Sequence, residues 1–160
     1  MRHDIFPTPV WHIEGAPLKL IDELYQGAYK FKEVYTDNQN RSSTGGYQTP
    51  PLEWDKFHPQ GREYIEKVVS ECDGHLFKSF EGVNWWFNIN GQGHWNTPHS
   101  HPGSDYALVF YLTDSDSLLQ FMSPHHMRQK QPSLRSINAK KGDILIFPSD
   151  ITHFVMPNPR

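Results

Sequence analysis

The spacing of apolar residues changes near the middle of this 160-residue chain. Before residue 73, apolar side chains recur every three or four positions in two stretches, which is the period of an amphipathic helix. These stretches predict helices over about 18–32 and about 59–72. From Leu76 onward, apolar residues occur in short runs separated by turn residues, a pattern typical of strands. We therefore expect a mainly β fold with two helices packed on one side of a barrel.

Five short runs in the second half predict strands that alternate with turns. The first run carries amide side chains and the indole of Trp86 on one face, and apolar rings such as that of Trp85 on the other. The second run, over 106–113, is apolar on both faces, which indicates a buried central strand. A turn over 114–116 is expected to join it in a hairpin to the third run, over 117–122. The predicted strands cover 83–90, 106–113, 117–122, 142–148 and 151–156.

The N-terminal half contains two less regular segments. The apolar run over 5–13 is interrupted by Pro7 and Pro9, so it is expected to form an edge strand or an extended arm. Residues 36–46 contain almost no apolar residue and predict a loop that continues to residue 51. This loop is either a solvated connection or a lid over a pocket, because long loops inside compact domains often have a function.

Three of the ten histidines form a pattern with a chemical meaning. His99 and His101 are two residues apart, so both imidazoles leave the same face of an extended backbone. His153 lies in the distant strand predicted over 151–156. Two imidazoles from one strand and a third from another can hold a divalent metal inside a barrel, and imidazole suits iron among other metals. The working hypothesis is a mononuclear iron site. The adjacent His125 and His126 are expected to be surface loop residues.

Composition limits the class of protein and its partners. Hydrophobic residues make up 36% of the chain, which is enough for the core of one domain of this length. A net charge of −3 without a basic run argues against nucleic acid as a partner. Cys72 is the only cysteine, so no intrachain disulfide is possible and a reducing compartment is expected. No stretch reads as a signal peptide or approaches the roughly 20 apolar residues of a membrane span, so we expect a cytoplasmic protein without a membrane partner.

Two segments carry a resemblance to a known family. Residues 96–112 contain an Asn-x-x-His-x-His-Pro-x-Ser motif followed by an apolar strand. Residues 142–158 contain a Gly-Asp-apolar run that ends in Phe-Pro-Ser shortly before His153. Together with 6–11 and 42–48, these segments resemble the 2-oxoglutarate and Fe(II)-dependent oxygenases over most of the chain.

The resemblance implies a fold and a domain arrangement. The fold is a double-stranded β-helix, which is a jelly-roll or cupin-like barrel, with flanking helices. Residues 1–160 are expected to form one such domain, with a helical part over about 1–75 and barrel strands over about 76–160.

The same resemblance implies an oxidoreductase, a dioxygenase that binds Fe(II) and takes 2-oxoglutarate as co-substrate, converting it to succinate and CO₂. The implied metal ligands are His99, His101 and His153. In the usual facial triad a carboxylate occupies the position of His101. Asp105 therefore remains an alternative to His101 as the third ligand.

Members of such families carry an Arg on the last strand that pairs with the distal carboxylate of 2-oxoglutarate, a group that a guanidinium fits well. Arg160, seven residues after His153, is the candidate in this chain. The closing strand is expected to be shortened or absent, which leaves three alternatives. Arg160 is the anchor, Arg160 is a solvated terminus, or the anchor lies in a segment outside this sequence. Tyr111, Asn88 and Asn96 are candidate pocket residues that hydrogen-bond the co-substrate.

Two other readings of the histidine pattern stay open. The segment from Gly93 to Asp105 also imitates the first motif of the cupins, with Asp in place of Glu, and Gly142, Pro148 and His153 imitate the second. Cupins include metal-binding proteins, dioxygenases and isomerases that do not use 2-oxoglutarate. The other reading is an inactive barrel used for binding or structure. The substrate, whether a small molecule or a peptide, and the oligomeric state cannot be read from the sequence.

Overall fold

The computed structural model describes residues 8–39, 41–72, 81–124 and 134–159. Two helices, a 3-10 turn and twelve short strands lie within these ranges. In chain order they are β1 Trp11–Ile13, α1 Leu18–Val34, β2 Ser43–Thr44, β3 Tyr47–Gln48, β4 Leu52–Glu53, the 3-10 turn Trp54–Lys56, α2 Pro59–Glu71, β5 Asn84–Trp85, β6 Asn88–Ile89, β7 Trp95–His99, β8 Tyr106–Phe110, β9 Leu119–Met122, β10 Leu134–Ile137, β11 Ile144–Pro148 and β12 His153–Val155.

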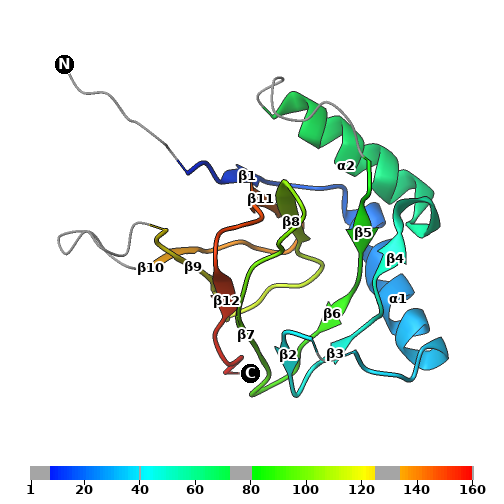
Figure 1. Ribbon diagram of the computed structural model, residues 1–160. Coiled ribbons are helices and arrows are strands. Elements are labelled where there is room, and N and C mark those ends of the chain that lie inside the picture. The colour runs from blue at the N-terminus through cyan, green and yellow to red at the C-terminus, as the bar shows by residue number, and fades with distance from the viewer. Residues whose placement is uncertain (1–7, 40, 73–80, 125–133, 160) are drawn as a thin grey trace.

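Two antiparallel sheets form the body of the molecule (Figure 1). One has the strand order β10-β9-β12-β7-β2 and the other the order β1-β11-β8. Their inner faces share one buried cluster, in which Leu119 and Phe121 of β9 meet Leu145 and Phe147 of β11. The two small sheets β3-β6 and β4-β5 continue the structure toward the helices.

Strand β11 organises both cores because its side chains alternate between two apolar environments. Ile144 and Ile146 pack with the helices, whereas Leu145 and Phe147 pack between the two sheets. All four side chains are at most 1% exposed. A strand buried on both faces reads as a continuous apolar run, so the prediction of a buried strand over 142–148 is confirmed.

The helices lie together on one side of the three-stranded sheet, as Figure 1 shows. Both predicted helices are confirmed to within two residues at either end. Pro59 occupies the first turn of α2, where its missing N–H costs nothing, and the Nδ1 of His58 accepts a hydrogen bond from the Gly61 N–H. Within the described residues, neither helix combines the length and the apolar character that crossing a membrane requires.

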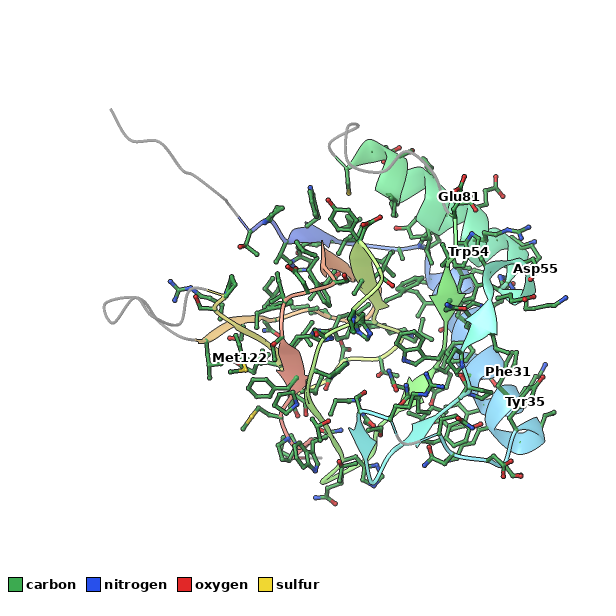
Figure 2. All side chains as sticks on the ribbon, viewed as in Figure 1. Phe31, Tyr35, Trp54, Asp55, Glu81 and Met122 are labelled. Carbon is green, nitrogen blue, oxygen red and sulfur yellow. The ribbon has the colours of Figure 1, made fainter. Side chains whose placement is uncertain are left out.

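Apolar side chains that are partly or largely exposed occur on both sides of the molecule. Phe31 and Tyr35 lie on the helical side, and Met122 lies on the opposite side, on the outer face of β9 (Figure 2). Met122 pairs directly with Leu134 of β10, and both side chains are more than 40% exposed.

Three strand predictions are wrong in their topology. Within the described residues, β8 is an edge strand whose one partner is β11. Both of its faces are apolar because one packs with the helices and the other lies between the two sheets. The predicted hairpin between β8 and β9 does not form, because the chain crosses from one sheet to the other and β9 pairs with β10 and β12. The predicted strand over 83–90 is two short strands, β5 and β6, in separate sheets.

The predicted loop over 36–51 is partly strand. Within it, β2 pairs with β7 and β3 pairs with β6. Ser43, Tyr47, Gln48 and Thr49 are buried, which a solvated connection would not require. The expected boundary near residue 75 is also crossed, because β1 and β2 from the N-terminal part join the two main sheets.

Asp143 fastens the start of β11 to the N-terminal strand. One of its carboxylate oxygens, Oδ2, lies 2.8 Å from the Nε2 of His12 and 2.8 Å from the backbone N–H of Lys140, and the backbone of Gly15 also bonds to the carboxylate. Burial raises the pKa of this carboxyl, but these donors together outweigh burial and hold the pKa below its usual value. Glu14 also lies close to this pair. Because the carboxylate of Asp143 already accepts these hydrogen bonds, we interpret the His12–Asp143 pair as a structural link between β1 and the start of β11.

Replacement of Asp143 with Asn should lower the free energy of unfolding by about 1–3 kcal/mol at pH 7, since hydrogen bonds to a charged acceptor are lost. A carboxyl with a depressed folded-state pKa stabilises the fold above its unfolded pKa, and the contribution is lost as the pH falls through the folded value. The difference between the wild type and Asp143→Asn should therefore shrink below about pH 4. Urea unfolding at several pH values measures this difference in the free energy of unfolding, and the exposed Asp37→Asn is the control. A difference that does not change with pH would contradict the stabilising role of the Asp143 carboxylate.

Candidate metal centre

Three histidines from three positions in the fold come together at one end of the five-stranded sheet. His99 is the last residue of β7 and His153 the first residue of β12, and the two are directly opposite each other in the antiparallel ladder. His101 follows two residues after β7, and its backbone N–H donates to the carbonyl of Ser149 at 2.8 Å. Backbone pairing therefore brings the two sequence motifs side by side.

The imidazole rings lie within reach of a single metal ion. The ring centroids of His99 and His153 are 4.3 Å apart, and those of His101 are 5.0 Å from His99 and 5.1 Å from His153. One nitrogen of each ring lies within 4.8 Å of a nitrogen of the other two. Zn–N and similar bonds are about 2.0–2.1 Å long, so nitrogens at this separation can share one ion after small rotations.

Two of the imidazoles are oriented by backbone carbonyls. The Nδ1 of His99 lies 2.7 Å from the carbonyl oxygen of Thr97, and the Nδ1 of His153 lies 2.9 Å from that of Ile151. A carbonyl only accepts, so each Nδ1 carries the hydrogen and each Nε2 presents its lone pair to the site. This second hydrogen bond is the usual way in which a protein fixes the tautomer and the orientation of a metal-binding histidine.

The environment keeps the rings of His101 and His153 in the neutral form that binds metals. Burial lowers the pKa of His153 to about 4, assisted by the neighbouring imidazoles and partly offset by the carbonyl of Ile151. Burial also lowers the pKa of His101, and His99 lowers it further. Behind the site, the ring of Phe147 lies 4.8 Å from that of His153 and excludes water from that side. The site therefore offers three nitrogen ligands to a cation.

Asp105 does not join this group. Its side chain is exposed, and its carboxylate is absent from the set of mutually close ligand atoms among the described residues. Its backbone carbonyl accepts from the N–H of Ser149, which fixes the turn that follows His101. Of the two alternatives that the sequence leaves open, the geometry brings His101 to the site and not Asp105.

The candidate co-substrate residues differ in their surroundings. Tyr111 belongs to the cluster between the sheets; burial, reinforced by Asp143, raises its pKa to about 12, so its hydroxyl stays uncharged. In the described part of the chain this hydroxyl has no hydrogen-bond partner. Asn88 is exposed on β6, opposite Gln48. Arg160 lies outside the described residues.

Asn96 lies in a network of side-chain hydrogen bonds. Its side chain is 5% exposed, accepts from the Nδ2 of Asn90 at 2.8 Å and donates to the Oγ of Ser42 at 3.2 Å. The oxygen of Asn90 in turn accepts from the Oγ of Ser43. These bonds tie β2 and the turn before β7 to β7 itself, so Asn96 supports the strand that carries His99.

Trp86 is a contact of the site that the histidine pattern does not predict. Its neighbour Trp85 is buried against the helices and donates its indole N–H to the carbonyl of Glu53. The ring of Trp86 instead lies 5.6 Å from that of His101, tilted by 49°. The signal in the sequence is the alternation of these two residues, which places them on opposite faces of the chain.

Comparison with known proteins agrees with this geometry. Residues 84–160, which contain β5 to β12 and all three histidines, match the family model described as Putative 2OG-Fe(II) oxygenase. The crystal structure of a Pseudomonas putida prolyl-4-hydroxylase has the same fold, with a TM-score of 0.70 and 13% sequence identity over 94% of this chain and 86% of that chain. No curated protein matches the sequence.

The matched region, which contains the candidate metal centre, is similar to the 2-oxoglutarate and Fe(II)-dependent oxygenases. The match and the shared fold support the prediction of a 2-oxoglutarate-dependent dioxygenase. The facing sheets are those of a double-stranded β-helix, so the fold class predicted from the sequence is confirmed.

Replacement of His99, His101 or His153 with Ala should each weaken Co(II) or Fe(II) binding by more than the 10–100-fold that the loss of an outer partner typically costs. The reason is that each change removes one of three ligands and leaves the fold intact. Metal titration followed by visible absorption measures the affinity, and circular dichroism controls for folding. Asp105→Ala is the matched variant and should bind metal as the wild type does. If His101→Ala retained a full equivalent of iron while Asp105→Ala lost it, the ligand set would be two histidines and Asp105.

Proposed function

We propose that this protein holds Fe(II) through His99, His101 and His153 and uses 2-oxoglutarate and O₂ to hydroxylate a substrate. The observation that supports the proposal most strongly is the cluster of three imidazoles, which lies inside the region that matches the oxygenase family. Three protein ligands leave the remaining coordination positions open to other molecules. Three uncharged ligands also leave the full charge of a dication in the site, which attracts the dianionic 2-oxoglutarate.

The protein's own part in the reaction is to bind and orient. Iron supplies the oxidative chemistry that converts 2-oxoglutarate and O₂ to succinate and CO₂ and delivers one oxygen atom to the substrate. Tyr111 offers an uncharged hydroxyl between the sheets and donates a hydrogen bond to a carboxylate of the co-substrate. Phe147, packed against His153, keeps that side of the site free of water and so strengthens the electrostatic interactions there.

The distal carboxylate of 2-oxoglutarate needs a cation, and the described residues offer one in register with the site. Arg135 of β10 is directly opposite Phe121 of β9, which is directly opposite His153 of β12. Directly opposite residues share a face of the sheet, so Arg135 begins on the same inner face as the histidines. Its side chain is exposed and makes no ion pair within the described ranges. Lys141, by contrast, pairs with Asp22 on the helical side.

Arg135 and Arg160 are therefore the two candidates for this anchor. Replacing the true anchor with Ala should weaken 2-oxoglutarate binding to the metal-loaded protein roughly tenfold to a hundredfold, because charged hydrogen bonds contribute about 1.5–3 kcal/mol. Titration calorimetry of Arg135→Ala, Arg160→Ala and Tyr111→Phe gives the comparison, and the exposed Lys140→Ala is the control. Wild-type affinity in both arginine variants would place the anchor elsewhere.

The substrate stays open within this proposal. The structural relative from Pseudomonas putida is a prolyl-4-hydroxylase, but at 13% identity the likeness concerns the fold. A small molecule or a peptide is compatible with the site, and the net charge of −3 disfavours nucleic acid.

One observation favours a second candidate function. All three clustered ligands are imidazoles, without the carboxylate of the usual facial triad. A cupin-type dioxygenase or metal-binding protein, which does not use 2-oxoglutarate, would also fit such a ligand set.

Consumption of 2-oxoglutarate separates the two functions. With Fe(II) and O₂ present, the wild type should convert 2-oxoglutarate to succinate slowly even without a substrate, and His153→Ala should not. Succinate is measured by mass spectrometry against a sample without O₂. A protein that binds one equivalent of iron and forms no succinate would contradict the oxygenase proposal and support the cupin-type alternative.

A further inference from the structure

His101 is held differently from the other two clustered histidines. The rings of His99 and His153 each bond to a backbone carbonyl two residues earlier in the chain. The ring of His101 makes no hydrogen bond to any described residue. Metal-binding histidines almost always have such a partner on their second nitrogen, because it fixes the ring's orientation. His101 needs some other means of orientation if it is to bind metal.

The backbone of His101 is fixed, so the remaining freedom is in its side chain. Its N–H donates to the carbonyl of Ser149 at 2.8 Å, and its carbonyl accepts from the N–H of Ser104 at 3.3 Å. With both backbone groups bonded, only rotation about the side-chain torsions moves the imidazole toward or away from the other two rings.

Trp86 is in the right place to restrict that rotation. Its ring centroid lies 5.6 Å from that of His101, within the range of specific aromatic contacts, and Trp86 itself is only partly buried. The adjacent Trp85 is anchored in the helical core by its indole N–H and by contacts with Phe31 and Phe57. Because Trp85 is fixed, the backbone that carries Trp86 is fixed as well.

We propose that Trp86 is the positioning residue for His101 and that ring packing replaces the missing hydrogen bond. The inference rests on the proposed metal-binding function, and it makes His101 the least firmly fixed of the three ligands. It also gives the pair of tryptophans separate roles: Trp85 supports the core, and Trp86 supports the metal site.

Metal titration of variants tests the coupling between the two residues. Trp86→Ala should bind Co(II) about 10–100-fold more weakly, the loss typical when an outer partner of a ligand is removed. Trp86→Phe should restore affinity and the visible Co(II) absorption close to the wild type, since a second aromatic ring provides the same packing. The double variant Trp86→Ala/His101→Ala should bind Co(II) no more weakly than His101→Ala, because Trp86 affects metal binding only through His101.

Trp54→Ala is the control for the loss of a packed tryptophan. Trp54 lies on the helical side of the molecule, stacked on Phe57, so its removal should lower stability and leave Co(II) affinity unchanged (Figure 2). Full Co(II) affinity in Trp86→Ala, or losses that simply add in the double variant, would overturn the proposal. A wild type that binds no metal at all would overturn both this inference and the proposed function, whereas metal binding without coupling overturns the inference alone.

A second measurement on the folded wild type does not depend on the alanine variants. Nitrogen NMR of the metal-free protein with ¹⁵N-labelled histidine should show His99 and His153 each as a single tautomer with a slowly exchanging Nδ1–H. His101 should show fast exchange of its ring hydrogen and, in Trp86→Phe, a shifted ring signal. A slowly exchanging ring N–H on His101 would reveal a hydrogen-bond partner and contradict the role given to Trp86.

Discussion

The antiparallel pairing of β12 with β7 is the constraint on which the metal centre depends. It sets His153 directly opposite His99, and the next pair along the ladder, Val155 and Asn96, is reached only after an irregularity in which β7 contains one more residue than β12. A slip of one residue would turn every side chain of β12 to the other face of the sheet. The register is held on both sides of β12, because Phe121 of β9 is also opposite His153 and packs on Phe147 from the facing sheet. The core between the sheets and the position of the imidazoles are therefore parts of one arrangement.

Much of this arrangement follows from local sequence, but its topology does not. The helices were predictable because their apolar spacing is a local property, and β11 because a strand buried on both faces is apolar throughout. The assembly of His99, His101 and His153 was predictable from two motifs, and the structure brings all three together. The hairpin after β8 was not predictable, because the turn over 114–116 looks the same whether the chain stays in one sheet or crosses to the other. β2 was missed because its Ser and Thr residues are buried by pairing with β7 rather than by their own apolar character. The contact of Trp86 with His101 was not predicted, because alternation along the chain assigns Trp86 to a face but does not tell which distant residue lies against that face.

The chemistry of the site follows from what holds each ligand. Carbonyls of Thr97 and Ile151 leave the Nε2 atoms of His99 and His153 facing the metal position. The third position, which a carboxylate fills in the usual facial triad, is occupied by an imidazole. Exchanging a carboxylate for a neutral ring raises the net charge of the loaded site by one unit. That change favours anionic co-substrates.

The central claim is that the three histidines form an iron site at which 2-oxoglutarate binds directly to the metal. The most direct measurement is visible absorption of the protein with Fe(II) and 2-oxoglutarate under strictly anaerobic conditions. A charge-transfer band that appears only when the protein, iron and 2-oxoglutarate are all present, and that is absent in His153→Ala, is the predicted result. Stoichiometric iron binding with no band on addition of saturating 2-oxoglutarate would contradict the claim.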